Sequence, residues 1–432
     1  MSFAFLLLAT CLLLPQDEDL RNLSGLSESD AAAVEDNETL DPSGPQFKKL
    51  LYRTGTVDSG VLRQWAKKTK DVSIQQVTAG PETFRFHPFS MNVKATSIRR
   101  FDFAPEDARD FLSGFYIVNC QTETGEEFVL ISRSSVSSWP LNENLSQPQQ
   151  IRFDGFFLGK LAIKLDQLET SARPVFIARR FAWFPDQENE SLKIDAAKVA
   201  LAKAGVDISL LDIVKSRKGE PIGNRESICY WQMLAACKTA RAPDAADRVD
   251  FATMLRSPLD SVGKFAAVQG RVRQCVSVKV TSPDAMKLLG TDTWYQLTIF
   301  PDLNGRPVEV GTRDSPEVYK NAFPVTVCAV DLPQGFDSES IVGSTFQCDG
   351  FFYRIWSYPS ERTQDSDLAG QPSPLMMAST MIKVKSTTGQ LQTLLGAVFL
   401  AMGLAIGFVV WFVSLSKKTK PRTELPDQIE AW

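Results

Sequence analysis

Two segments of the chain share the tetrapeptide Asp-Gly-Phe-Phe inside a run of strand-forming residues. The first is FDGFFLGKL, which begins at Phe153, and the second is QCDGFFYRI, which begins at Gln347. A match at domain-sized separation is a reason to look for an internal repeat, and a repeat decides how the rest of the chain is divided. We therefore asked whether other features recur around both segments in the same order.

Further matches flank both segments, and their order is kept. The offset between the two copies only increases along the chain, as insertions in the second copy would cause. Two copies of a domain-sized unit indicate a tandem duplication and not a solenoid. The matched features are Asp107-Ala108 with Asp284-Ala285, the strands from Phe115 and Trp294, the turns at Gly125 and Gly305, EFVLISR with RPVEVGTR, and Pro174 to Ala178 with Pro374 to Ala378.

Each copy is predicted to contain five main strands, and a long polar loop precedes the fourth. In the first copy they cover 93–103, 115–122, 127–133, 149–161 and 174–184. This strand number and spacing resembles a small Greek-key barrel of the oligonucleotide/oligosaccharide-binding (OB) type. We predict a mainly β fold with a helical insert, in which two duplicated OB-like barrels are followed by one C-terminal transmembrane helix.

The repeated tetrapeptides are interpreted as structural positions. A glycine inside a strand favours a bulge or sharp bend, which a barrel needs in order to close. We expect Gly155 and Gly350 to occupy such a bend, with little room for a larger side chain. The full set of structural repeat positions is Asp154, Gly155, Phe156, Asp349, Gly350 and Phe351.

The ends of the chain predict a membrane protein. Phe3 to Leu14 is an apolar run too short to span a bilayer, and acidic residues follow it, as is typical of a signal peptide. Leu394 to Leu415 lacks charged residues and is long enough to span, with lysines directly after it. We expect a single-pass type I protein of the plasma or inner membrane, with its bulk extracytoplasmic and a cytoplasmic tail.

Small residues in the predicted span lie close to one face of a helix, where they would permit close helix packing. They are Gly396, Gly403, Gly407 and Ser414. The expected divisions of the chain are a signal peptide (1–15), a disordered acidic arm and linker (16–58), a short helix (59–73), the first barrel (74–185), a helical insert (186–257), the second barrel (258–385), the transmembrane helix (391–415) and the tail (416–432).

Motifs that carry chemistry are missing from the sequence. It has one histidine, His87, and no Gly-x-Ser-x-Gly, phosphate-binding loop, Cys-x-x-Cys or His-Glu-x-x-His pattern. We predict no catalytic, cofactor-binding or metal-binding residues and no cofactor. The net charge of −4 gives no domain-wide basic excess, so we exclude a nucleic-acid partner.

These features predict a non-enzymatic binding or scaffold protein of the cell envelope, with the membrane and a protein partner or a second copy of the chain as partners. An alternative is a module that binds an envelope polysaccharide or another polymer, for which tryptophans such as Trp139 and Trp294 could supply stacking faces. An enzyme with an unrecognised site is a third hypothesis.

Overall fold

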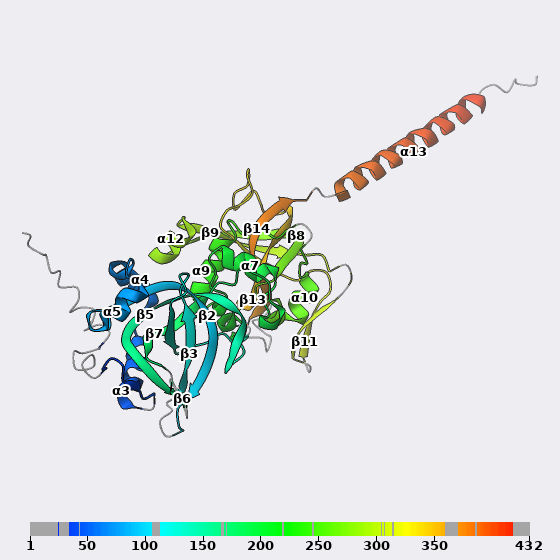
Figure 1. The fold of residues 1–432 in the computed structure, drawn as a ribbon. Helices are drawn as coiled ribbons and strands as arrows, with labels where there is room; N and C mark the ends of the chain where they lie inside the picture. Colours follow the sequence, from blue (N-terminus) through cyan, green and yellow to red (C-terminus); the bar gives the residue numbers. More distant parts are fainter. Residues whose placement is uncertain are drawn as a thin grey trace, which may run out of the picture.

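The computed structural model describes residues 34–42, 44–105, 113–165, 168–169, 171–217, 220–243, 246–303, 305, 307–312, 315–358, 370–384 and 387–417, together with Gly25. The fold is mainly β, with two sheets and several helices. Figure 1 shows helices α7 (Ala196–Lys203) and α9 (Ser227–Ala236) between the two groups of strands. The predicted signal peptide lies outside the described residues.

Five long strands form the first sheet, and their pairings make a closed circuit. They are β2 (Pro88–Asp102), β3 (Gly114–Gln121), β4 (Glu127–Ser132), β5 (Glu143–Leu165) and β7 (Arg173–Trp183). Antiparallel pairs join β2 to β3, β3 to β4, β2 to β5 and β5 to β7, and a parallel pair joins β4 to β7. The short strands β1 (Thr39–Leu40) and β6 (Leu168–Glu169) pair with β5.

The second sheet is a closed barrel with the same order and the same sense of every pairing. Its strands are β8 (Phe265–Lys279), β9 (Thr293–Phe300), β12 (Val325–Ala329), β13 (Thr345–Tyr358) and β14 (Gln371–Lys383). The only parallel pair described in it joins β12 to β14, which corresponds to β4 and β7 in the first sheet. A separate hairpin consists of β10 (Val308–Thr312) and β11 (Ser315–Tyr319).

Irregularities in strand register also match between the sheets. The β2–β3 register shifts between Ala95 and Ser97, and the β8–β9 register shifts between Val272 and Gln274. On the fourth strand of each sheet the shift falls at the Asp-Gly segment, where Gly155 pairs with Ala178 and Gly350 pairs with Ala378. A bulge bends its strand, so both sheets turn at the same place.

One of the sequence matches is wrong. The segment RPVEVGTR does not correspond to EFVLISR, because its residues Val308–Thr312 form β10 of the separate hairpin. The strand in the place of β4 is β12, VTVCA, whose five residues are all buried. The hairpin is an insertion between the second and third strands of the barrel. The third strand must be apolar because both of its faces are buried, and β12 meets this requirement. Asp107 and Ala108 lie outside the described residues.

The linker expected to be disordered contains ordered structure. Helix α3 (Pro45–Thr54) lies within it and buries Phe47, Leu50 and Leu51. These side chains join a cluster with Phe115, and the rings of Phe47 and Phe115 are 4.8 Å apart. The helix is amphipathic, so the first sheet supplies the apolar partner that the isolated sequence lacked. The other helices before β2 are α4 (Ser59–Trp65), η1 (Ala66–Thr69), α5 (Ile74–Ala79) and α6 (Pro81–Phe84).

The insert between the sheets forms a common core with them. Its helices, besides α7 and α9, are η2 (Glu190–Leu192), η3 (Ile208–Leu210) and α8 (Leu211–Ser216). Buried residues from the insert and from both sheets belong to one apolar cluster. Asp207 accepts hydrogen bonds from the Trp183 backbone N–H at 2.9 Å and from the Arg180 guanidinium, so the insert is fixed to β7.

Three further helices accompany the second sheet, and one more lies at the C-terminal end. They are α10 (Phe251–Arg256), α11 (Pro258–Ser261), α12 (Pro283–Leu289) and α13 (Thr387–Lys417). Figure 1 shows α13 extending away from the rest of the chain, and its described side chains, Val398 to Val413, are exposed.

The predicted membrane span is not supported. Among the helices of the described part of the chain, none has the length and apolar character needed to cross a bilayer. The prediction of a transmembrane helix, and with it the plasma- or inner-membrane location of a single-pass protein, is therefore wrong. It was based on the composition of Leu394 to Leu415, the lysines after this run and the predicted signal peptide. The outer residues of the run have no described side chains.

Candidate functional site

The two repeated aspartates each contact an arginine that precedes the first strand of their sheet. Asp154 is buried and accepts hydrogen bonds from Ser90 Oγ at 2.6 Å and Arg63 Nη2 at 2.7 Å. Asp349 is half-buried and lies 3.5 Å from Arg248 Nε. Each carboxylate thus connects its sheet to the segment that leads into that sheet. They belong to different sheets and do not form a carboxylate pair.

The repeated glycines lie against backbone of the fifth strand. A Cβ at Gly155 would be 2.4 Å from the carbonyl oxygen of Ile177, and one at Gly350 would be 1.9 Å from that of Met377. The phenylalanines that follow, Phe156 and Phe351, are buried. The surroundings of the six positions differ in part: Asp154 is buried and Asp349 half-buried, and Phe156 and Phe351 belong to different apolar clusters.

The proposed helix-packing face can be assessed only in its middle. A Cβ at Gly403 or Gly407 would have no heavy atom within 4 Å. The side-chain surroundings of Gly396 and Ser414 lie outside the described residues. A stripe of small residues without a described contact identifies no site.

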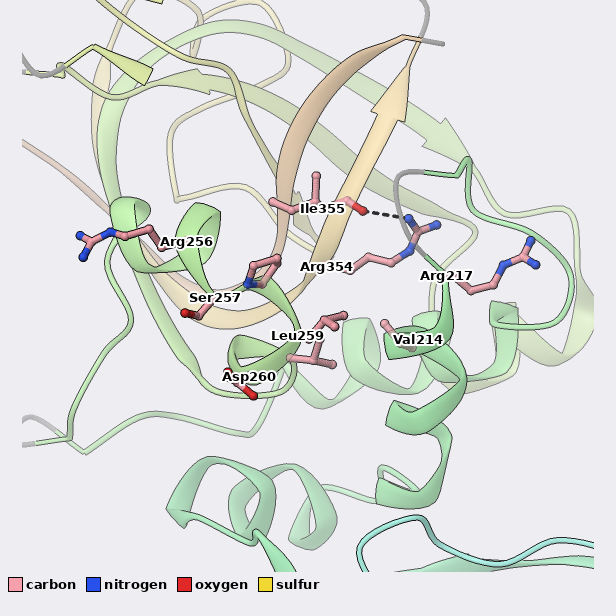
Figure 2. A pocket seen from close by; sticks show the side chains of 10 residues that line it. Val214, Arg217, Arg256, Ser257, Leu259, Asp260, Arg354 and Ile355 are labelled. Carbon is pink, nitrogen blue, oxygen red and sulfur yellow. Dashed lines mark hydrogen bonds between the residues drawn. The ribbon is translucent and has the colours of Figure 1, made fainter. Parts of the chain in front are cut away.

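A pocket lies where the insert meets the second sheet (Figure 2). Its volume is about 520 Å³. Helix α8 and the residues after it form one wall, α10 and α11 form another, and β13 forms the third. The lining residues are Val214, Arg217, Arg256, Ser257, Pro258, Leu259, Asp260, Val262, Arg354 and Ile355.

Local sequence explains why these walls form. Ser257 and Pro258 end α10 and begin α11, because proline is favoured at the first position of a helix and disrupts an established one. The chain therefore turns at this point, and Leu259 remains 42% exposed beside the pocket. In Figure 2, Leu259 lies in the middle of the view, between the arginine side chains.

A buried ion pair fixes one wall of the pocket. Glu226 accepts hydrogen bonds from Arg354 Nε at 3.0 Å and from Arg354 Nη2 at 2.7 Å, and both side chains are almost fully buried. Tyr353 donates its hydroxyl to Glu226 Oε2 at 3.1 Å. Burial, aided by nearby Cys229 and Glu226, raises the pKa of Tyr353, so its phenol stays protonated and continues to donate. Arg354 therefore contributes a neutralised guanidinium.

A second arginine at the same side of the pocket is only partly paired. Arg217 Nη2 lies 2.5 Å from Oε2 of the exposed Glu220. Its Nε is buried and has no hydrogen-bond partner within the described ranges. Figure 2 shows the guanidinium groups of Arg217 and Arg354 on one side of Leu259 and that of Arg256 on the other, and the side chains of Arg217 and Arg256 both extend away from Leu259.

Sequence reasoning missed this pocket. Its residues come from three separated segments, 214–217, 256–262 and 354–355. No spacing pattern connects them. The Ser257-Pro258 pair is a turn signal, but a turn signal does not indicate a pocket. Among the residues that the structure describes, no cluster of His, Cys, Asp and Glu could hold a metal ion.

The chain was compared with known proteins. No family model matches it, and no curated protein matches it. Similar solved structures include a deletion variant of the single-stranded DNA binding protein from Thermus aquaticus, with 8% identity, a TM-score of 0.15, and coverage of 70% of this chain and 96% of that one. The wild-type protein is 7% identical, with a TM-score of 0.15 and coverage of 70% of this chain and 94% of that one. A Replication Protein A heterotrimer bound to ssDNA is 10% identical, with a TM-score of 0.19 and coverage of 69% of this chain and 49% of that one.

These comparisons correct two predictions. The exclusion of a nucleic-acid partner is wrong, since the similar structures are of single-stranded DNA binding proteins. The role as a membrane-anchored binding or scaffold protein of the cell envelope, with polysaccharide or a protein as partner, is also wrong, because neither these structures nor the described helices support it. TM-scores of 0.15 to 0.19 nevertheless carry no argument about the ligand of this chain.

Proposed function

We propose that this chain binds a small, largely apolar organic molecule in the pocket between the insert and the second sheet. The observation that carries the proposal is a cavity of about 520 Å³ with Val214, Leu259 and Ile355 among its lining side chains. Ligand pockets in proteins typically occupy about 300 to 1,000 Å³ and combine apolar walls with a few polar groups. This pocket has that size and that chemistry.

Leu259 supports the proposal most directly. An exposed leucine is ordinary on a protein surface, but this one borders a cavity and faces other apolar side chains. Covering it with an apolar ligand would remove its surface from water, at about 25 cal/mol for each Å². The Arg354–Glu226 pair is already buried and carries no net charge, so covering it with an apolar group removes little hydration.

Binding can be tested with the intact chain and an environment-sensitive dye such as Nile red, followed by displacement with small apolar compounds. Leu259→Asp puts a charge beside the cavity and should weaken dye binding at least about tenfold, which is ~1.4 kcal/mol. Leu288→Asp is the matched control, because Leu288 is 47% exposed on α12 and does not line the pocket. Equal dye binding by both variants would contradict the proposal.

We also propose that segments 88–184 and 265–384 are duplicated OB-like Greek-key barrels. Support comes from their equal strand order, the single parallel pair in each circuit, and the shared register shifts at Gly155 and Gly350. In this proposal the six Asp-Gly-Phe positions are inherited structural positions. An experimental structure with a different strand order in the two segments would contradict it.

A further inference from the structure

An arginine in the middle of the outer face of the first sheet has accessible terminal nitrogens. Arg152 on β5 lies opposite Asn92 of β2 and Ala182 of β7. Its chain neighbours Ile151 and Phe153 are buried in the core, so Arg152 points outward. The side chain is half-buried, and neither terminal nitrogen forms a hydrogen bond with any described residue. Only its Nε is without exposed surface, so both terminal nitrogens can be reached from solvent.

The charges closest to Arg152 are already compensated by one another. Asp154 pairs with Arg63, and Asp207 pairs with Arg180. Burial, followed by the charge of Arg63, lowers the pKa of Arg152. A guanidinium nonetheless stays protonated at neutral pH. The cluster therefore keeps one positive charge for which the described residues provide no ion-pair partner.

A cavity of about 260 Å³ lies beside this guanidinium. Arg152 Cζ is 5.2 Å from the ring centre of Phe184, and both Phe184 and Asn92 line the cavity. Arg152 is thus next to two of the lining side chains. The outer face of the sheet forms one wall, and the C-terminal end of α7 forms another. The polar lining residues are Asn92, Gln150, Asp186 and Lys203.

Further cations make the surroundings of the cavity positive. Lys203 lines it, and Lys94 lies opposite Gln150 on the sheet. In the described part of the chain neither lysine forms an ion pair, and Asp186 is the carboxylate of the lining. Together with Arg152 there are three unpaired cations and one carboxylate, which leaves a net charge of +2. A phosphate monoester carries about −1.5 to −2 at pH 7 and would balance this charge.

From this geometry we propose that the site binds the phosphate monoester of a small polar molecule, with the phosphate at the terminal nitrogens of Arg152. Two parallel N–H donors of a guanidinium match two oxygens of a phosphate. The site lies on the first sheet, and the apolar pocket lies beside the second. The two proposals are therefore independent of each other.

The cavity determines what the phosphate is attached to. The side-chain amides of Asn92 and Gln150 form no hydrogen bond with the described residues, and each amide can both donate and accept. Phe184 and Pro185 add apolar surface. The volume is slightly below the about 300 to 1,000 Å³ of typical ligand pockets, so the ligand must be small. A ring with polar edges, in a nucleotide or in a sugar phosphate, has this chemistry.

Isothermal titration of the full chain with adenosine monophosphate, cyclic adenosine monophosphate and adenosine varies the charge while the base stays the same. We expect the monophosphate, a monoester, to bind at least about tenfold more tightly than the cyclic diester or the uncharged nucleoside. Ribose 5-phosphate distinguishes the two kinds of ring. An affinity equal to that of adenosine monophosphate assigns the cavity to a sugar phosphate, and a weaker affinity assigns it to a nucleotide.

Two variants test the role of Arg152. Arg152→Gln should weaken binding of adenosine monophosphate at least about tenfold, and urea unfolding of the same variant shows whether the chain still folds. Asn92→Asp changes an exposed residue and places a negative charge opposite Arg152, so it should weaken the same ligand at least about tenfold. Arg99→Gln is the matched control, because Arg99 is an exposed arginine of β2 that does not line the cavity. It should leave the affinity within about twofold of the unmodified chain.

Equal affinity for the three adenosine compounds, an unchanged affinity in Asn92→Asp or in a folded Arg152→Gln, or no binding of any phosphate compound would overturn the inference. A single-stranded DNA oligonucleotide without a terminal phosphate, which contains only diesters, is the last probe. Tighter binding of this oligonucleotide than of adenosine monophosphate, lost in Arg152→Gln, would assign the site to a nucleic-acid strand and overturn the monoester. The dye experiment on the apolar pocket is unaffected by any of these results.

Discussion

The substitution Gly350→Ala tests how closely the fourth and fifth strands approach at the repeated bulge. The added Cβ would lie 1.9 Å from the carbonyl oxygen of Met377 and 2.9 Å from Ala378 Cα. Real Cβ atoms essentially never approach closer than 3.0 Å. The obstacle is backbone and cannot rotate away, so β13 and β14 must separate at this point.

The magnitude follows from the size of that movement. Adding volume to a closely packed site costs about 1–3 kcal/mol, and a backbone clash belongs at the upper end of that range. We expect Gly350→Ala to lower the free energy of unfolding by about 3 kcal/mol. Gly155→Ala, whose Cβ would be 2.4 Å from the Ile177 carbonyl oxygen, should cost about 2 kcal/mol.

Urea unfolding followed by circular dichroism measures both losses, with Gly80→Ala as control. The Cβ at Gly80 would be 3.7 Å from Thr83 Oγ1, an ordinary contact at a helix end, so its cost should stay within about 0.5 kcal/mol. If Gly350→Ala were as stable as Gly80→Ala, the close approach of the strands would be refuted. A larger loss at Gly155 than at Gly350 would contradict the ranking.

Three further outcomes are expected. Glu226→Gln leaves Arg354 buried without a charged partner and should cost about 3–5 kcal/mol by urea unfolding; a loss below about 1 kcal/mol would contradict the burial of the pair. Asp154→Asn should lower the free energy of unfolding by about 1–2 kcal/mol, because Asp154 accepts two short hydrogen bonds. Asp349→Asn should lower it by less than about 1 kcal/mol, because Asp349 lies 3.5 Å from its arginine. Burial raises the pKa of the Cys275 thiol to about 11, so its reaction with a disulfide reagent should accelerate about tenfold per pH unit from 8 to 10. A rate that levels off near pH 9, measured against Cys275→Ser, would exclude the raised pKa.

Local sequence signals predicted much of the β architecture. Strands such as Phe115 to Thr122 were recognisable because β-branched and aromatic residues cluster between turn signals, and β3 covers Gly114–Gln121. The Asp-Gly segments were recognisable as bends because a glycine inside a strand favours a bulge. In the structure, a Cβ at either glycine would lie 2.4 Å or less from a backbone carbonyl oxygen. The matched order of features therefore located three of the five strand pairs, the second, fourth and fifth.

The sequence match for the third strand was wrong because similar residue types do not distinguish a barrel strand from an inserted hairpin. Val308–Thr312 alternates polar and apolar residues, as an exposed hairpin does, whereas Val325–Ala329 is buried throughout. Helix α9 shows the same limit. The spacing of Ile228, Trp231, Leu234 and Ala235 predicts one apolar stripe. In the structure, however, Ile228 is 55% exposed, while Tyr230 and Met233 are buried. A helix with neighbours on several sides buries a wider face than one stripe predicts.

The candidate site was inaccessible to sequence reasoning for another reason. Arg217, Leu259 and Arg354 are far apart in the chain, and none belongs to a motif. Their proximity depends on how the insert packs against the second sheet, which is a tertiary property. Glu226 gave no signal either, since a glutamate before a helix is ordinary, and only its burial shows that it must have a charged partner.

Two buried carboxylates explain why the insert acts as part of the core and not as a spacer between the sheets. Asp207 forms a salt bridge with Arg180 of the first sheet, and Glu226 forms one with Arg354 of the second. Leaving a buried carboxylate without its partner would cost several kcal/mol, so separating either sheet from the insert is strongly unfavourable. The walls of the pocket come from both sides of the second of these contacts, α8 from the insert and β13 from the sheet. The Arg354–Glu226 pair therefore helps to keep these walls together, and a ligand in the pocket would stabilise the docked arrangement by RT ln(1 + c/Kd), where c is the free ligand concentration.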